Sequence, residues 1–198
     1  MMERKAIITR RTTETDIKLT LIIDGREPSR IFSGVPFFDH MLSALAKHGR
    51  FTLDLQCTGD TEVDDHHTVE DVGICLGKAI HKALGEKAGI IRFGDALVPM
   101  DDALAQAAVD LAGRAYFHYR GPKLTGRIGA YSEELTVEFL RALSTHGEFN
   151  LHVIVHHGEN GHHIHEAVFK AIGVALRKAW AVDETRSGDI PSTKGTVS

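Results

Sequence analysis

The chain has 198 residues, of which 42% are hydrophobic, enough to bury the core of one domain or of two small ones. Its formal net charge of −4 argues against nucleic acid or an anionic membrane surface as a partner. The first residues lack the apolar core of a signal peptide, and no apolar run is long enough to span a membrane. We therefore expect a cytoplasmic protein whose two cysteines, Cys57 and Cys75, are reduced.

In the first half of the chain, the hydrophobic pattern predicts strands and helices in turn. Residues 17–25 alternate as a strand, and residues 37–49 have a helical period that ends at a glycine. Residues 51–59 alternate again, and residues 66–85 form a second amphipathic pattern with helical spacing. If the second half shows the same order of elements, the chain contains an internal repeat.

The second half repeats this order. Residues 103–119 supply strands, residues 133–147 a helix, residues 149–158 a strand and residues 162–180 a helix. We read each half as β-β-α-β-α, which predicts an α+β fold with largely antiparallel or mixed sheets. Because a unit of this size buries little by itself, we expect one domain over residues 1–198, made of two pseudo-symmetric halves.

We place the two repeats at about residues 1–93 and 94–185, with the boundary near Gly89 to Pro99. A C-terminal tail follows at residues 186–198. Its composition is rich in Gly, Pro, Ser and Thr, which is typical of a flexible chain end.

The pattern HHxxE occurs twice, beginning at His66 and again 96 positions later at His162, each time at the start of a helical pattern. Helical residues three and four apart share a face, whereas adjacent histidines diverge by about 100°, so each motif divides its ligands between two sites. Imidazole with carboxylate suits zinc, manganese, iron or nickel. One copy could be surface or capping histidines, but two copies in equivalent positions predict a centre with two metal ions.

Five segments, in this order, resemble the imidazoleglycerol-phosphate dehydratase family over essentially the full length of the chain. They are FFDHML with a following HG in residues 37–49, DDHHTVED in 64–71, PMDDAL in 99–104, NGHHIHEAVFKA in 160–171 and PSTKG in 191–195. The resemblance implies a duplicated fold like domain 2 of ribosomal protein S5. It also implies a homo-oligomer of 24 subunits with two Mn²⁺ ions per active site.

The activity that the resemblance implies is that of a hydro-lyase, a carbon–oxygen lyase of L-histidine biosynthesis. Such an enzyme dehydrates D-erythro-imidazole glycerol phosphate to imidazole acetol phosphate and water through a metal-bound imidazolate. The small phosphorylated imidazole is then the partner to expect, with no nucleic acid and no membrane.

The resemblance also carries over site residues. The implied metal ligands are His40, His66, His67, Glu70, Glu138, His162, His163 and Glu166. The implied acid–base groups are Glu14 and Glu166. The implied substrate contacts are Glu14, His48, Arg92, Arg114, Lys170, Ser192, Thr193 and Lys194. Family members often have histidine where this chain has Glu138, the internal counterpart of His40, so the two metal sites are expected to differ in charge.

Lys170 breaks the internal symmetry. It follows Glu166 by four residues and therefore lies on the metal-binding face, whereas the first half has Ile74 at the matching position. A dianionic phosphate requires convergent cations in an acidic protein, so Lys170 marks the phosphate end of an asymmetric substrate. Composition alone indicates a flexible tail. The resemblance implies instead that the tail becomes ordered over bound phosphate.

Two other functions fit the ligand spacing. A two-metal hydrolase uses similar His and carboxylate pairs, and it would hold two close metals with a short bridging ligand. A non-catalytic metal-binding or storage protein would have no need of Arg92, Arg114, Lys170 or the tail. Dehydration differs from both because the imidazole ring must lie between the metals.

Overall fold

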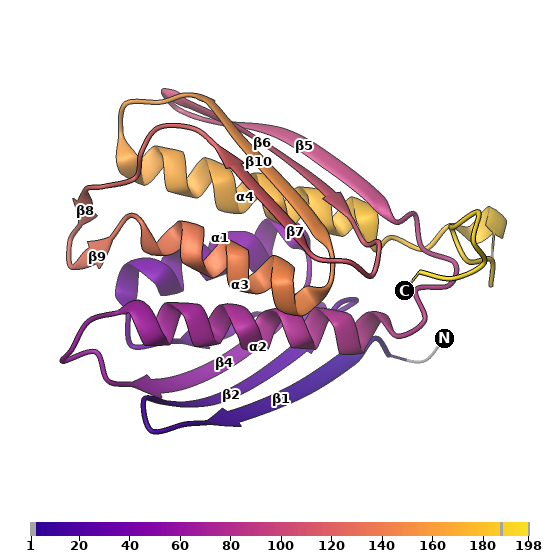
Figure 1. Cartoon of the computed structure of the whole chain (residues 1–198), viewed down its shortest axis with the longest axis horizontal. Coiled ribbons are helices and arrows are strands. Elements are labelled where there is room, and N and C mark those ends of the chain that lie inside the picture. Colours follow the sequence, from indigo (N-terminus) through magenta and orange to yellow (C-terminus); the bar gives the residue numbers. More distant parts are fainter. Residues whose placement is uncertain (1–2, 187, 198) are drawn as a thin grey trace.

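The computed structural model describes residues 3–186 and 188–197, which form three layers (Figure 1). Two four-stranded sheets lie outside, and four helices fill the space between them. None of the described helices combines the length and apolar content needed to cross a bilayer.

The first half builds one sheet and two helices. Its elements are β1 (Lys5–Arg11), β2 (Thr15–Ile22), β3 (Arg30–Phe32), α1 (Pro36–Gly49), β4 (Thr52–Gly59) and α2 (His66–Leu84). The strand order is β1-β2-β4-β3, with β1, β2 and β4 antiparallel and the short β3 parallel to β4.

The second half repeats this topology. Its main elements are β5 (Phe93–Met100), β6 (Ala103–Asp110), β7 (Tyr116–Arg120), α3 (Leu135–Gly147), β10 (Asn150–His157) and α4 (Gly161–Ala179). The strand order β5-β6-β10-β7 matches that of the first sheet, including the parallel edge strand. A small hairpin of β8 (Arg127–Ile128) and β9 (Tyr131–Ser132) precedes α3, and a short 3₁₀ helix, η1 (Glu184–Arg186), leads into the tail.

The expected α+β fold with two similar halves is confirmed. The predicted strand ranges contain β2, β4, β6, β7 and β10. The structure adds β1 and the short parallel β3 to the first sheet and β5 to the second. Three residues of β3 are too few to show a period, which is why the pattern did not reveal this strand.

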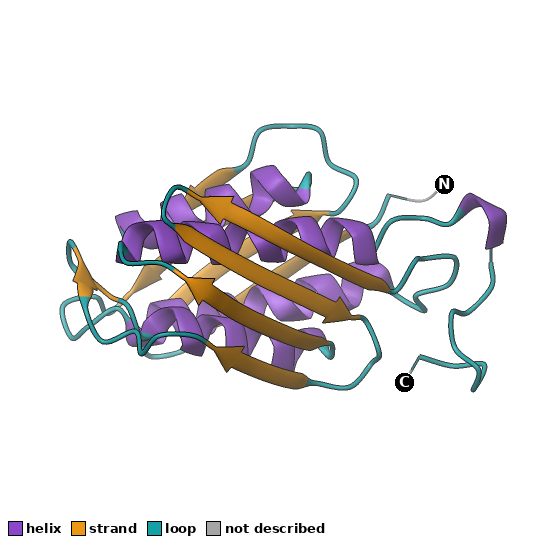
Figure 2. Ribbon diagram, turned by 90° about the horizontal axis from the view of Figure 1, so that it is seen from above, coloured by secondary structure: helices purple, strands orange, loops and turns teal. Residues whose placement is uncertain are grey.

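The helices of the two halves interlock. Helix α1 packs against α4, and α2 packs against α3, so each helix pair contains one member of each half. Figure 2 shows the second sheet lying across the helical layer. Alternating residues of the strands point into this layer, and Ile17, Leu19 and Leu21 of β2 are fully buried there. One continuous core therefore joins both halves.

Glycines allow the helix pairs to approach closely. A Cβ atom on Gly77 of α2 would lie 2.6 Å from the carbonyl oxygen of Leu143 in α3. A Cβ atom on Gly173 of α4 would lie 2.5 Å from the carbonyl oxygen of Leu45 in α1. Both clashes involve backbone atoms, which cannot rotate away, so the position is restricted to glycine in both halves.

We predict that Gly77→Ala and Gly173→Ala each lower the free energy of unfolding by about 1–3 kcal/mol, because the added methyl group forces the helices apart. In an ordinary helix the same change would be stabilising by up to about 1 kcal/mol. Thermal or urea unfolding measures the effect. Thr145→Ala, at an exposed position of α3, is the control and should change stability little. Stabilisation by either glycine substitution would contradict the close contact.

Candidate metal-binding active site

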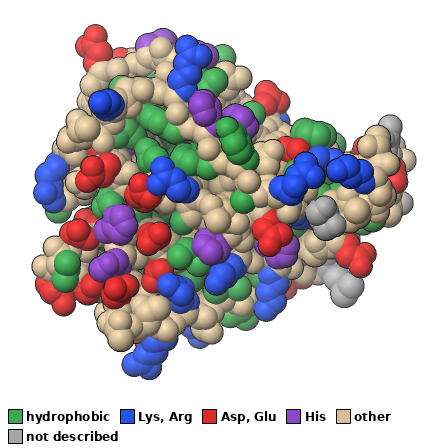
Figure 3. Space-filling view, in the orientation of Figure 1, with side chains coloured by type: hydrophobic (Ala, Val, Ile, Leu, Met, Phe, Trp, Pro, Cys, Tyr) green, Lys and Arg blue, Asp and Glu red, His purple; other side chains and the backbone are tan. Residues whose placement is uncertain are grey.

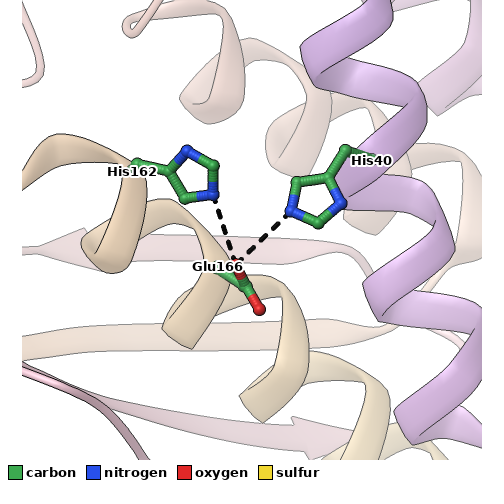
Figure 4. A group of neighbouring side chains, drawn as sticks. All are labelled: His40, His162 and Glu166. Carbon is green, nitrogen blue, oxygen red and sulfur yellow. Dashed lines mark ion pairs between the residues drawn. The ribbon is translucent and has the colours of Figure 1, made fainter.

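Three predicted ligands converge between α1 and α4 (Figure 4). Nε2 of His40 lies 3.4 Å from Oε2 of Glu166, and Nε2 of His162 lies 3.3 Å from the same oxygen. One ligand atom from each of these residues lies within 4.8 Å of the others, and no other group of three or more does so among the described residues. Two imidazoles and a carboxylate, with no thiolate, fit a divalent ion such as Mn²⁺ or Zn²⁺.

The sequence explains how these side chains meet. His162 and Glu166 are four residues apart on α4 and share a face. Asn160 caps this helix, its side chain accepting a hydrogen bond from the backbone N–H of His162. His40 comes from the first turns of α1, which starts at Pro36. The contact of α1 with α4 then completes the group.

Lys170 lies one turn further along α4, as predicted, and its Nζ is 2.7 Å from Oε1 of Glu166. Burial alone would raise the pKa of Glu166, but the hydrogen bonds and charges of Lys170 and His40 outweigh it and lower this pKa. Glu166 is therefore a carboxylate at neutral pH, as a metal ligand must be.

An open cleft of about 880 Å³ adjoins this group. His40, His48, Glu166 and Lys170 line it together with the loop after β2. Burial and the charge of Lys170 lower the pKa of His48, which favours a neutral imidazole facing the cleft. The predicted substrate contacts His48 and Lys170 thus share one cavity with the candidate metal ligands.

His67 lies in a second cluster, at the start of α2. Its Nδ1 is 3.0 Å from Oδ2 of Asp60, and its Nε2 is 3.7 Å from Oε1 of Glu14. The hydrogen bond with Asp60 raises the pKa of His67. A carboxylate can only accept, so Nδ1 carries the hydrogen, and in the neutral ring Nε2 keeps its lone pair for a metal.

His163 has the equivalent arrangement in the second half. Its Nδ1 hydrogen-bonds to Oδ1 of Asp102, whose Oδ2 accepts from the backbone N–H groups of Glu159 and Asn160. These hydrogen bonds, that of His163 first, hold the pKa of Asp102 well below its usual range. Asp102 therefore stays ionised and fixes the orientation of the His163 ring.

The remaining predicted ligands lie on the α2–α3 pair. His66 and Glu70 are in the first turns of α2, and Glu138 is in the first turn of α3, where His40 stands in α1. Glu138 forms an ion pair with Arg141, with 2.6 Å between Oε2 and the guanidinium. These three do not converge as the His40 group does, so the metal-binding role of Glu138 stays a prediction.

The tail supplies a third cluster at the far end of the molecule. A cavity of about 130 Å³ there is lined by Arg92, Ala112, Arg114, Ser192, Thr193, Lys194, Thr196 and Val197. It unites five of the predicted substrate contacts, and Figure 3 shows lysine and arginine side chains gathered at this end. Lys170, expected to act with them, lies in the other cleft of the same chain.

Comparison with known proteins decides the family. The sequence profile described as imidazoleglycerol-phosphate dehydratase matches residues 33–176. The chain belongs to the imidazoleglycerol-phosphate dehydratase family. The protein of that name from Geobacillus kaustophilus is 53% identical over 99% of this chain and 100% of its own length. The one from Leptospira biflexa is 52% identical with the same coverage.

Solved structures agree with this assignment. The imidazoleglycerol-phosphate dehydratase from Staphylococcus aureus superposes with a TM-score of 0.82 at 31% identity, over 90% of this chain and 99% of that one. The enzyme from Pyrococcus furiosus in complex with (S)-C348 superposes with a TM-score of 0.81 at 34% identity, over 96% and 99% of the two chains. The family fold therefore extends over nearly all of the chain.

Sequence reasoning missed one residue that positions a candidate ligand. Asp60 had no motif to mark it, although it corresponds to Asp102 as the partner of a motif histidine. His165, a histidine outside the predicted ligand set, is fully buried and shares a hydrogen bond of 2.9 Å with Thr136. Burial lowers its pKa to about 4, so it is a neutral packing residue at pH 7.

We predict that His40→Asn weakens Mn²⁺ binding by at least about tenfold, because one of the three converging ligands is lost. Titration of the metal-free protein, followed by Mn²⁺ electron paramagnetic resonance, measures this. His118→Asn, on the outer sheet, is the matched control and should leave binding unchanged. Equal affinities of the His40 variant and the unmodified protein would remove His40 from the centre.

Proposed function

We propose that this chain dehydrates imidazole glycerol phosphate to imidazole acetol phosphate, the hydro-lyase step of histidine biosynthesis, with Mn²⁺ as the metal. The observation that carries the proposal is the convergence of His40, His162 and Glu166 at a cleft that also contains Lys170. Family membership over the full length supports the choice of reaction.

The reaction removes the hydroxyl group from the carbon attached to imidazole and the hydrogen of the C–H group on the next carbon, which leaves the enol of the product. That C–H group is too weak an acid for a side chain alone at neutral pH. A divalent ion on the imidazole supplies the Lewis acidity that draws negative charge into the ring. The protein must then bind the imidazole ring of the substrate, transfer two protons, and bind the phosphate group of the substrate at a place apart from the metal.

Glu14 and Glu166 are the proposed acid–base groups. Glu166 is ionised and is held by Lys170, which suits a ligand that can also accept a proton. Glu14 sits in the turn between β1 and β2, with its backbone N–H bound to the hydroxyl of Thr12. Its half-exposed carboxylate lies near Nε2 of His67, the nitrogen that we assign to metal.

The phosphate group is proposed to bind in the tail cavity. Arg114 and Lys194 supply positive charge there, and Ser192 and Thr193 supply hydroxyl groups. A metal-storage protein would have no use for such a cavity, so its presence favours the dehydratase over that alternative.

The proposed site requires more than one copy of the chain. The His40 group, the His67 cluster and the tail cavity are three separate places in one chain. Asp60 and Asp102 occupy Nδ1 of His67 and His163, so Nε2, which lies near the carboxylates of Glu14 and Asp101, is the nitrogen that we assign to metal. We propose a homo-oligomer, of 24 subunits by family resemblance, in which neighbouring copies bring these groups together around one substrate.

The assay is turnover of imidazole glycerol phosphate by the manganese-loaded protein, with the loss of one water followed by mass spectrometry. We expect product, and we expect Glu14→Gln to lower kcat by about 10²–10⁴-fold, because a proton-transfer group is lost. Manganese content should not change in this variant. Glu3→Gln, an exposed glutamate near the N-terminus, is the control. No turnover by freshly loaded, assembled protein would refute the proposed function.

Removal of the metal should also change the size of the assembly, since ligands from separate copies would lose their common ion. We expect light scattering to detect smaller particles after treatment with a chelator, and re-addition of Mn²⁺ to restore the large species. A chelator already saturated with metal is the control. An unchanged mass after complete metal removal would show that assembly does not depend on the shared ligands.

A further inference from the structure

Arg92 has an unusual backbone conformation in the segment between α2 and β5. Its φ of 76° lies in the left-handed region, which is costly for a residue other than glycine. Its N–H donates to the carbonyl of Ala179 at the end of α4, and its carbonyl accepts from the N–H of Leu111 after β6. The backbone is thus fixed between two elements, which determines where the side chain starts.

The side chain is held just as firmly. Nε donates to Oδ1 of Asp110 at 2.7 Å, and one terminal nitrogen donates to Oδ2 at 3.1 Å. The other terminal nitrogen donates to the carbonyl of Pro191 in the tail at 2.8 Å. A guanidinium group has five N–H donors in a rigid plane, so two remain, one on each terminal nitrogen. Arg92 lines the tail cavity, where those two can meet an anion.

The other two cationic side chains of this cavity, Arg114 and Lys194, are not fixed by such contacts. The side-chain nitrogens of Arg114 and Lys194 have no hydrogen bond or ion pair with any described residue. At about 130 Å³ the cavity has the volume of roughly four waters, which suits a phosphate group rather than the whole substrate. Arg92 therefore differs from its neighbours: it is oriented in advance, and it also fixes the tail.

The first half contains the same side-chain arrangement, without the left-handed backbone. Arg4 precedes β1 as Arg92 precedes β5, and its carbonyl accepts from the N–H of Ile23. Its guanidinium binds both carboxylate oxygens of Asp24, at 2.8 and 2.5 Å, and donates to the carbonyl of Trp180 at 2.5 Å. The cavity lined by the tail lies beside Arg92 and not beside Arg4. The duplication thus provides two arginine–aspartate pairs, which we call clamps. The Arg4–Asp24 clamp contacts the main fold, whereas the Arg92–Asp110 clamp contacts the tail and lies at the tail cavity.

We infer that Asp110 is a positioning residue for phosphate recognition: it aligns Arg92 so that one terminal nitrogen fixes Pro191 of the tail while two donors stay available for the anion. The inference rests on the proposed function for the identity of the substrate. The orientation of Arg92 and the docking of the tail can be tested without turnover.

The first experiment uses trypsin cleavage after Lys194, an exposed residue of the tail, with inorganic phosphate as the probe. Phosphate should slow this cleavage in the unmodified protein, compared with sodium chloride of equal ionic strength. In Asp110→Asn the protection should be lost, because Arg92 no longer holds both the tail and the anion. Intact-mass measurement separates this cut from cleavage after Arg186.

The second experiment is kinetic. Asp110→Asn should raise KM for the phosphorylated substrate by about ten- to a hundredfold, the equivalent of one or two charge-assisted hydrogen bonds, with kcat within about twofold. Asp24→Asn removes an equivalent bidentate carboxylate from the other clamp, and it should leave phosphate protection and KM unchanged.

Arg92→Lys keeps the positive charge, but lysine cannot donate the two parallel hydrogen bonds to Asp110. This variant should therefore behave as Asp110→Asn does. If Asp110 acts only through Arg92, the double variant should be no worse than either single one. Arg92→Lys also carries the test alone if Asp110→Asn does not fold, which melting temperatures will show.

Normal phosphate protection and KM in Asp110→Asn would overturn the inference, and so would equal losses in Asp24→Asn or additive losses in the double variant. Phosphate protection that depends on Asp110 in a protein without dehydratase turnover would support the clamp and refute the proposed function instead.

Discussion

Close backbone contact between helices of opposite halves is the constraint on which the rest of the structure depends. Gly77 and Gly173 let α2 approach α3 and α4 approach α1 until only a hydrogen atom fits between the backbones. The three converging candidate ligands come from two helices of one such pair. Their separation is therefore set by the helix contact, and the loops contribute little to it.

Much of this organisation could be predicted from the sequence. The apolar periods locate the helices and several strands, and the second HHxxE motif locates two of the three converging side chains, because helical spacing alone determines that His162 and Glu166 share a face. The segments shared with the family then indicate the tail and Lys170. These features depend on residues that are near each other in sequence or that belong to motifs.

Other features depend on contacts between distant parts of the chain, which a single sequence does not reveal. The pairing of α1 with α4 across the halves is one example. The hydrogen bond of Asp60 with His67 is another, since nothing in the loop after β4 distinguishes Asp60 from its acidic neighbours. The separation of Lys170 from the tail cavity also contradicts the simple picture of one phosphate site built within a single chain.

The cross-half origin of the His40 group has a consequence for the history of such a chain. His40 belongs to the first repeat, whereas His162 and Glu166 belong to the second. A protein made of one repeat would have both types of helix, but the interlocked contact between them would have to come from another molecule. An ancestral half-length chain could thus assemble this ligand group only as a dimer, and fusion of two copies would have made a subunit interface into the interior of one fold.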